Sequence, residues 1–234
     1  MIEQWNYRRL SRFWLTSFLS LTVGLFGVAA GGTASVGAQT RNPTSATKVG
    51  ALSALNKLAV KGRAPKTGYE RSAFSDGWGR FNGCDTRNLI LARDLKNVTF
   101  RDACIVESGT LQDPYTGKSI DFVRGVGTSL AVQIDHVVAL SDAWQKGAQK
   151  ISAAARYSLY NDPLNLLAVD GPTNGAKSDS DAASWLPPNK GYRCSYVARQ
   201  IAVKRKYLLW VTLAEKSAMA KVLSTCPSQK LPRR

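Results

Sequence analysis

A disulfide bond between Cys194 and Cys226 requires the chain between them to turn back on itself. This segment contains neither Gly nor Pro, and its composition is that of a helix. One straight helix across it would be roughly 46 Å long at about 1.5 Å per residue, whereas bridged cysteines have Cα atoms about 4.4–6.8 Å apart. The sequence TLAE at residues 212–215 matches a capping box with Thr212 as the N-cap. It therefore predicts two antiparallel helices that separate near Trp210, which would allow the bridge.

The other two cysteines, Cys84 and Cys104, can be joined by closing a modest loop. No cysteine belongs to a CxxC pair, which argues against a zinc site built from cysteines. Four cysteines in this arrangement fit an oxidising compartment and permit three pairings. We favour Cys84–Cys104 with Cys194–Cys226, although the sequence leaves the other pairings open.

The first 38 residues have the features of a signal peptide. An arginine-rich stretch precedes Phe13–Ala30, which is apolar and uncharged. Residues 36–38 are Val-Gly-Ala and provide the small side chains of a cleavage site before Gln39. The alternative is an uncleaved membrane anchor, because about 18 apolar residues can just span a bilayer. We favour cleavage and a secreted protein.

The charge of the chain is strongly positive. It contains 32 Lys and Arg against 16 Asp and Glu, a formal net charge of +16. A hydrophobic content of 44% is that of a globular protein and excludes a disordered basic tail. The charge therefore predicts attraction to a polyanion, namely nucleic acid, anionic lipid or an acidic wall polymer, without choosing among them.

Composition shifts along the chain suggest the domain boundaries. Residues 39–68 are expected to form a flexible segment, in which leucines at positions 52, 55 and 58 predict a short helix before the linker KGRAPKTG. The main domain is expected over residues 69–226. Residues 227–234 form a basic tail.

Within the main domain, strand and helix patterns alternate. LILARDLKNV predicts a short helix, and LQDPYTGKSIDFV predicts two strands joined by a turn. β-branched residues over positions 132–138 predict a strand, and apolar spacings of three and four over positions 141–160 predict one amphipathic helix. A strand at residues 164–169 and a helix that starts near Asn174 follow. Tryptophans 144, 185 and 210 are expected in the core.

His136 is the only histidine in the chain, and Asp135 directly precedes it in an apolar run. The simplest interpretation is a buried structural Asp–His pair. Asn165, Asn174 and Lys177 further along the chain favour a catalytic role instead.

In this order and spacing, IDHVVALS, NLLAV and TNGAKSD resemble the HNH, or ββα-metal, endonuclease motif. The resemblance is to the exported branch related to the C-terminal domain of GmrSD-type restriction enzymes. DPYTGKSIDF upstream is similar to the hairpin before the Asp-His strand in HNH domains of RNA-guided nucleases. The resemblance covers about residues 69–226. It implies an α+β fold: a small ββα-metal core with a helix inserted between the strands, extended by N-terminal and C-terminal helices.

The resemblance also implies a role for each motif residue. His136 would be the general base, since a histidine pKa near about 6.5 leaves it mostly neutral at pH 7. Asp135 and Asn174 would hold one divalent ion, Mg²⁺ or alternatively Mn²⁺, through oxygen atoms. Asn165 would brace the loop that aims the base, and Lys177 would bind a phosphate as a point charge.

Several of these residues have a structural alternative. Asn165 can be a turn residue and Asn174 a helix cap. Arg87 can contact phosphate or form a structural ion pair with Asp85. The C-terminal basic residues can form a solvated helix face or contact nucleic acid; they are Arg199, Lys204, Arg205, Lys206, Lys216 and Lys221.

The sequence departs from the common HNH pattern in three ways. Asn174 stands where many members have His, which favours a hard cation over zinc. The zinc-binding cysteine pairs of many members are missing, and disulfides can replace them. About twenty extra residues separate the two strands, and this insertion is expected to shape substrate access.

Together these features predict a secreted, metal-dependent nuclease of low sequence specificity. DNA is the expected substrate ahead of RNA, and we expect a monomer without a small-molecule cofactor. The alternative is a secreted, non-catalytic binder of nucleic acid or anionic wall polymer on a nuclease-like scaffold.

Overall fold

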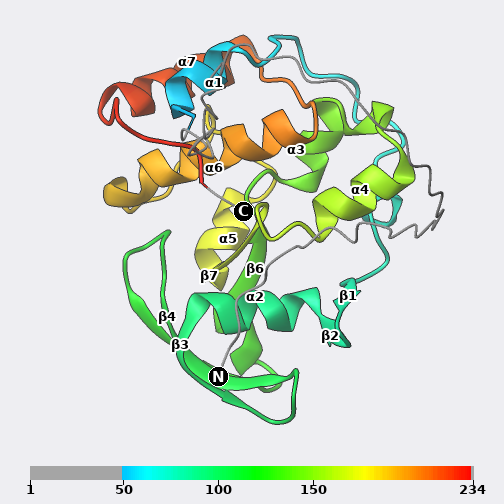
Figure 1. Cartoon of the computed structure of the whole chain (residues 1–234), viewed down its shortest axis with the longest axis vertical. Coiled ribbons are helices and arrows are strands. Elements are labelled where there is room, and N and C mark those ends of the chain that lie inside the picture. Colours follow the sequence, from blue (N-terminus) through cyan, green and yellow to red (C-terminus); the bar gives the residue numbers. More distant parts are fainter. Residues whose placement is uncertain (1–48, 233–234) are drawn as a thin grey trace, which may run out of the picture. The chain divides into compact units, whose positions relative to one another are not determined.

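An antiparallel ribbon of two strands lies at the centre of the computed structural model, which describes residues 49–232 (Figure 1). The strands are β6 (Val132–His136) and β7 (Leu166–Asp170), paired from Val132 opposite Asp170 to His136 opposite Leu166. Helix α5 (Gly171–Lys177) follows β7 directly and packs on both strands. This β–β–α unit within a mixed α+β fold confirms the expected fold class.

The insertion between β6 and β7 is not the single helix predicted over residues 141–160. It forms α3 (Leu140–Gln145), a 3-10 turn (Ala148–Lys150) and α4 (Ala153–Tyr160). The break occurs at Gly147, whose φ of +126° lies outside the helical region. Periodicity alone missed it, because the apolar spacing continues on both sides of the glycine.

Gly147→Ala is expected to lower the free energy of unfolding by about 1–3 kcal/mol, because the backbone conformation is strained for any other residue. A Cβ atom at this position would also lie 3.2 Å from the Trp210 ring. Chemical denaturation of both proteins measures the loss. Gly175→Ala is the matched control: it is helical and has open space, so it should stabilise by up to about 1 kcal/mol. Equal changes in the free energy of unfolding for the two variants would contradict a special backbone requirement at Gly147.

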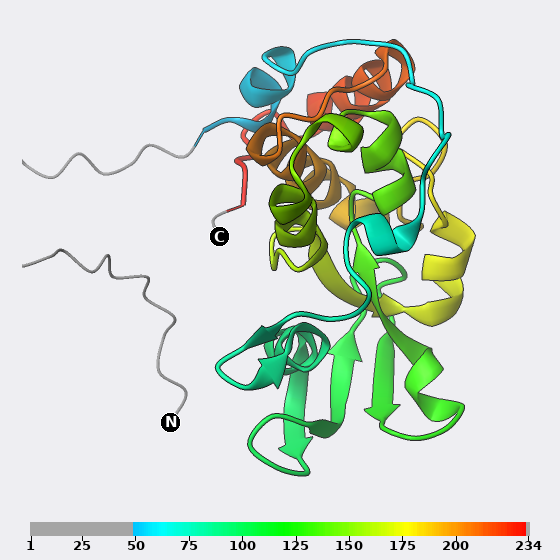
Figure 2. The same ribbon diagram turned by 90° about the vertical axis from the view of Figure 1, so that its right-hand side faces the viewer.

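A three-stranded antiparallel sheet lies on one side of the ribbon, with strand order β3-β4-β5 (Figure 2). The strands are β3 (Leu95–Phe100), β4 (Val106–Gln112) and β5 (Ser119–Val123). The predicted hairpin is confirmed, with Gln112 opposite Ser119. On one face of this sheet, Leu111 and Phe122 are buried in a hydrophobic cluster that also contains residues of both ribbon strands.

Helix α2 (Thr86–Asp94) packs between this sheet and the ribbon. It ends four residues earlier than LILARDLKNV predicted, because Leu95 already begins β3. A short hairpin of β1 (Arg80–Phe81) and β2 (Cys84–Asp85) precedes it. Asp85 caps α2 by accepting the Asn88 backbone N–H at 2.7 Å.

The C-terminal segment forms two helices, as the capping box predicted. They are α6 (Arg193–Lys206) and α7 (Leu213–Ser224). The Thr212 side chain accepts the Glu215 backbone N–H at 3.1 Å, and Leu208 in the connection has a φ of +55°. Both expected disulfides form: Cys84–Cys104 and Cys194–Cys226 have Cα atoms 5.1 and 6.5 Å apart. The predicted pairing is therefore confirmed.

Helix α1 (Ala51–Asn56) packs against α6 and α7 on the side of the ribbon away from the sheet (Figures 1 and 2). Ala51, Ala54 and Leu55 are buried there, so this part of the segment expected to be flexible belongs to the same compact unit. No helix among residues 49–232 is long and apolar enough to cross a membrane. The predicted signal peptide, residues 1–38, and the last two residues of the tail lie outside the described residues.

A buried ionic network joins the insertion to the C-terminal helices. Lys146 and Lys204 are fully buried, and their ammonium groups lie within 3.2 Å of carboxylate oxygens. Lys204 therefore belongs neither to a solvated helix face nor to a nucleic-acid contact, the two alternatives that the sequence left open for it. The members of the network are Arg63, Asp142, Lys146, Asp181, Lys204 and Glu215.

Candidate functional site

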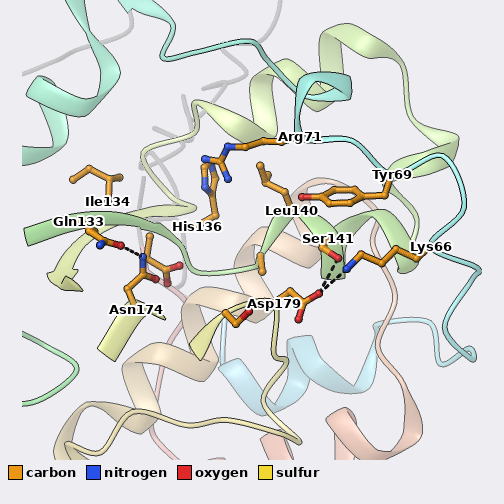
Figure 3. A pocket seen from close by; sticks show the side chains of 13 residues that line it. Lys66, Tyr69, Arg71, Gln133, Ile134, His136, Leu140, Ser141, Asn174 and Asp179 are labelled. Atoms are coloured by element: carbon orange, nitrogen blue, oxygen red, sulfur yellow. Dashed lines mark hydrogen bonds and ion pairs between the residues drawn. The ribbon is translucent and has the colours of Figure 1, made fainter. Parts of the chain in front are cut away.

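A pocket of about 700 Å³ opens at the end of β6 (Figure 3). Asp135 and His136 reach it from the last two paired positions of the strand. Asn174 reaches it from α5. The fold thus brings three of the predicted site residues, separated by some forty positions, into the wall of one cavity.

His136 lies deep in this wall, with 5% of its surface exposed. Its Nε2 atom is 2.9 Å from the backbone oxygen of Tyr160, the last residue of α4. The Trp78 ring stacks on the imidazole, with centroids 5.7 Å apart and planes inclined by 9°. These contacts fix both the plane and the rotation of the ring.

The contact with Tyr160 determines which nitrogen of His136 can act as a base. A carbonyl oxygen only accepts hydrogen bonds, so Nε2 carries the proton and donates it. Nδ1 is therefore the nitrogen that keeps a free lone pair in the neutral ring. Burial, followed by the positive charge of Arg71, lowers the pKa of His136 to about 3. The imidazole is consequently neutral at physiological pH.

Asn165 supports the turn that follows His136. Its Oδ1 accepts the Val138 N–H at 2.8 Å, and its backbone oxygen accepts the Val137 N–H at 2.8 Å. The Asn165 amide group donates to the Val138 carbonyl at 3.3 Å. The residue is fully buried, so its position fits a bracing role and excludes direct contact with a substrate.

Asp135 is held from two sides by protein donors. The Tyr115 hydroxyl, from the turn between β4 and β5, donates to Oδ2 at 2.5 Å. The Lys177 ammonium donates to Oδ1 at 2.9 Å and to the His136 backbone oxygen at 3.0 Å. Lys177 is fully buried. The structure therefore places it beneath Asp135 as a counter-ion, away from the solvent-facing position expected of a phosphate contact.

Asn174 is not the cap of its helix. Asp170 has that role, because its side chain accepts the Thr173 N–H at 2.8 Å. The Asn174 amide nitrogen donates to Gln133 Oε1 at 2.9 Å (Figure 3). The amide oxygen is therefore the atom available to accept a hydrogen bond or bind a cation at the pocket wall.

Several pocket residues were not predicted from the sequence. Arg71 and Lys66 bring positive charge to the rim, and the Arg71 side chain extends toward His136 (Figure 3). Lys66 pairs with Asp179 at 3.1 Å, and Ser141 donates to the same carboxylate oxygen at 3.0 Å. These residues belong to no motif, so only the fold reveals their proximity.

Arg87 lies away from this pocket, on α2. Burial and the nearby Arg124 lower its pKa, and it does not line the cavity. Asp85, which caps α2, opposes this pKa shift through its negative charge. This attraction to Asp85 is in line with the structural interpretation of Arg87, and its phosphate contact stays a prediction.

The donor atoms at the pocket suit only certain cations. Among residues 49–232, no group of three or more His, Cys, Asp and Glu side chains is arranged to hold a metal ion. Among the predicted site residues, the oxygen donors at the pocket are the Asp135 carboxylate and the Asn174 amide oxygen. A small, hard cation such as Mg²⁺ is often held by one or two protein oxygens, with water and substrate phosphate completing its shell. The residues present fit such an ion and do not fit structural zinc.

Comparison with known proteins gives two matches. Residues 85–222 match the family described as GmrSD restriction endonucleases, C-terminal domain. An uncharacterized secreted protein of Arthroderma benhamiae is 40% identical over 179 residues, which cover 75% of this chain and 84% of the relative. No solved structure matches the chain. The family match includes all the motif residues, from Asp135 to Lys177.

Proposed function

The chain belongs to the family of GmrSD restriction endonuclease C-terminal domains, and from this premise we propose that it is a secreted, metal-dependent endonuclease of the HNH type. The observation that carries the proposal is the state of His136. Its ring is neutral, oriented by Tyr160 and Trp78, and placed in a pocket wall beside Asp135. A neutral ring and a fixed orientation are two of the properties that a base needs to deprotonate water.

His136 would take the proton from the attacking water at Nδ1. A lone pair at this atom is ensured because Nε2–H is committed to the Tyr160 carbonyl. Asn165 contributes indirectly, because it fixes the backbone of Val137 and Val138 directly after the base. General-base catalysis of this kind typically contributes about 10²- to 10⁴-fold to the rate.

Asp135 and Asn174 would hold the metal ion, Mg²⁺ in preference to Mn²⁺. When bound, such an ion supplies positive charge to the scissile phosphate and to the leaving oxygen. Tyr115 and Gln133 orient the two ligands, through the hydrogen bonds to Asp135 and from Asn174. This support keeps the donor oxygens in place before substrate arrives.

Arg71 and Lys66 are the proposed phosphate contacts, in place of Lys177. Both are exposed at the rim and line the same pocket as His136. Arginine can bind phosphate through two parallel hydrogen bonds. With such backbone contacts, binding would be weakly specific and would fall steeply with salt. DNA is the proposed substrate ahead of RNA.

Plasmid cleavage tests the proposal directly. The purified protein with Mg²⁺ or Mn²⁺ is expected to nick and linearise supercoiled DNA, and EDTA should abolish the reaction because Asp135 and Asn174 act through the metal. Conversion of supercoiled plasmid on agarose gels gives the rate. Retarded but uncut plasmid at all metal concentrations would overturn the nuclease proposal and favour a non-catalytic binder of nucleic acid.

Asn174→Ala should raise the metal concentration that gives half-maximal cleavage, since it removes one of two protein ligands. Changes near a metal ligand typically cost about 10- to 100-fold in metal affinity or activity. The readout is the rate as a function of Mg²⁺ concentration. Asn189→Ala is the control, because this asparagine is bonded to Pro114 outside the pocket. Identical metal curves for Asn174→Ala and the unmodified protein would exclude Asn174 as a ligand.

A further inference from the structure

The carboxylate proposed to bind the metal is already neutralised by the protein. Lys177 Nζ lies 2.9 Å from Asp135 Oδ1 and is fully buried. Tyr115, also fully buried, occupies the other carboxylate oxygen. Each oxygen retains further lone pairs for a cation, but the negative charge that would attract one is compensated by a fixed ammonium group.

The remaining charges around the pocket do not restore a negative potential. Asp179 pairs with Lys66 at 3.1 Å, which leaves that side of the rim balanced. Arg71 adds an exposed positive charge at the same rim. The three cations Lys66, Arg71 and Lys177 therefore outnumber the two carboxylates Asp135 and Asp179, and the pocket carries a net positive charge before any ligand binds.

From this charge balance we infer that the metal ion and the phosphate backbone of the substrate bind the pocket cooperatively, with Lys177 as the residue that keeps metal affinity low in the absence of substrate. The inference rests on the proposed nuclease function and adds that the two ligands of its site raise each other's affinity. A positive pocket repels a divalent cation and attracts a phosphodiester. The phosphate then supplies negative charge and oxygen ligands, which a small, hard cation needs to complete its shell.

Thermodynamic linkage requires this coupling to be reciprocal: DNA raises the affinity for metal by the same factor by which metal raises the affinity for DNA. Couplings between two ligands commonly amount to about 5- to 150-fold. The cleaving state would therefore assemble only on a nucleic acid, and the free protein would hold little metal.

The first test measures Mn²⁺ binding by electron paramagnetic resonance of the free ion. The His136→Ala protein is used so that a short DNA duplex stays intact during the titration. We expect the duplex to raise Mn²⁺ affinity by at least about 5-fold. His136→Ala/Asp135→Asn with the same duplex is the control, because it subtracts the ions that DNA binds by itself. Equal Mn²⁺ affinity with and without duplex would overturn the inference.

The second test changes the counter-ion. Lys177→Met keeps the length of the side chain and removes its charge, so it should bind Mn²⁺ without DNA at least about 5-fold more tightly than the unmodified protein. Lys96→Met is the matched control: it changes the total charge equally, at an exposed position on β3. An unchanged or weaker Mn²⁺ affinity in folded Lys177→Met would contradict the role of Lys177. If circular dichroism shows that this variant does not fold, the duplex titration decides alone.

The two proposals can fail separately. Tight Mn²⁺ binding by the free protein, together with metal-dependent plasmid cleavage, would overturn the coupling and leave the nuclease proposal intact. Absence of Mn²⁺ binding beyond the Asp135→Asn control, together with uncut plasmid, would overturn both.

Discussion

His136→Ala is expected to slow metal-dependent DNA cleavage by about 10²- to 10⁴-fold, the contribution that a positioned general base typically makes. The chain has no second histidine that could replace it. The measurement is the single-turnover rate with enzyme in excess over a defined duplex, which separates the chemical step from binding. Cleavage at the unmodified rate would remove His136 from the mechanism.

Tyr160→Phe is the matched control for this variant. It removes the hydroxyl that Arg71 contacts at 3.3 Å but keeps the backbone oxygen that orients His136. Its rate should stay close to that of the unmodified protein. The His136→Ala protein should also keep its DNA affinity and its circular dichroism spectrum, because the substitution is expected to lower the catalytic rate alone.

The pH dependence of kcat/KM provides an independent test of His136 as the base. A base must be neutral in the free enzyme, and burial together with Arg71 lowers the pKa of His136 to about 3. The rate should therefore show no acidic limb centred near about 6.5, the ordinary histidine value. A limb at that pH that disappears in His136→Ala would show that the imidazole is solvated before substrate binds.

The same shift links His136 to stability. Between about pH 6.5 and about pH 3, the unfolded chain binds a proton at this histidine that the folded protein does not bind. The contribution of His136 to stability is therefore fully present above about pH 6.5 and is lost as the pH falls toward about 3. His136→Ala should reduce the acid sensitivity of the free energy of unfolding in this range.

The motif predicted which residues lie close together in the fold but not the contacts that each side chain makes there. Asp135, His136 and Asn174 could be placed in one site because their order and spacing are those of a β–β–α unit. Lys177 has the correct spacing too, yet its ammonium group points inward to Asp135. Spacing along a helix does not show which side chain is buried, so charge alone suggested a phosphate contact.

Other site residues left no local signal in the sequence. Trp78 and Arg71 reach His136 from a segment about sixty positions earlier, through contacts that depend on the packing of the whole domain. Tyr160 contributes a backbone atom, for which side-chain identity carries no information. The insertion that supplies Tyr160 thus supports the proposed base in addition to lining the pocket.

The second large effect is a loss of folding stability, expected for a substitution in the buried ionic network rather than in the pocket. Lys146→Ala should lower the free energy of unfolding by about 3–5 kcal/mol, because removing one partner of a buried ion network leaves uncompensated charge in the interior. Lys146 Nζ lies 2.6 Å from Asp142, 2.7 Å from Asp181 and 2.6 Å from Glu215. Three carboxylates would then face only two cations. Denaturant unfolding followed by tryptophan fluorescence measures the change.

The Lys146→Ala substitution should also perturb the pocket. Asp142 follows Ser141 and Asp181 lies two residues after Asp179, so the network anchors two pocket residues that bond to each other at 3.0 Å.

Lys66→Ala is the control for charge at the surface. Its pair with Asp179 is about half exposed, and such pairs are typically worth about 0–1 kcal/mol. Lys204 gives a further check within the network: burial disfavours its charge, but Asp142 and Glu215 outweigh burial and raise its pKa above the ordinary value. Lys204→Ala should therefore destabilise the protein nearly as much as Lys146→Ala. A loss below about 1 kcal/mol for both lysines would mean that water solvates these carboxylates and that the network is not a closed interior cluster.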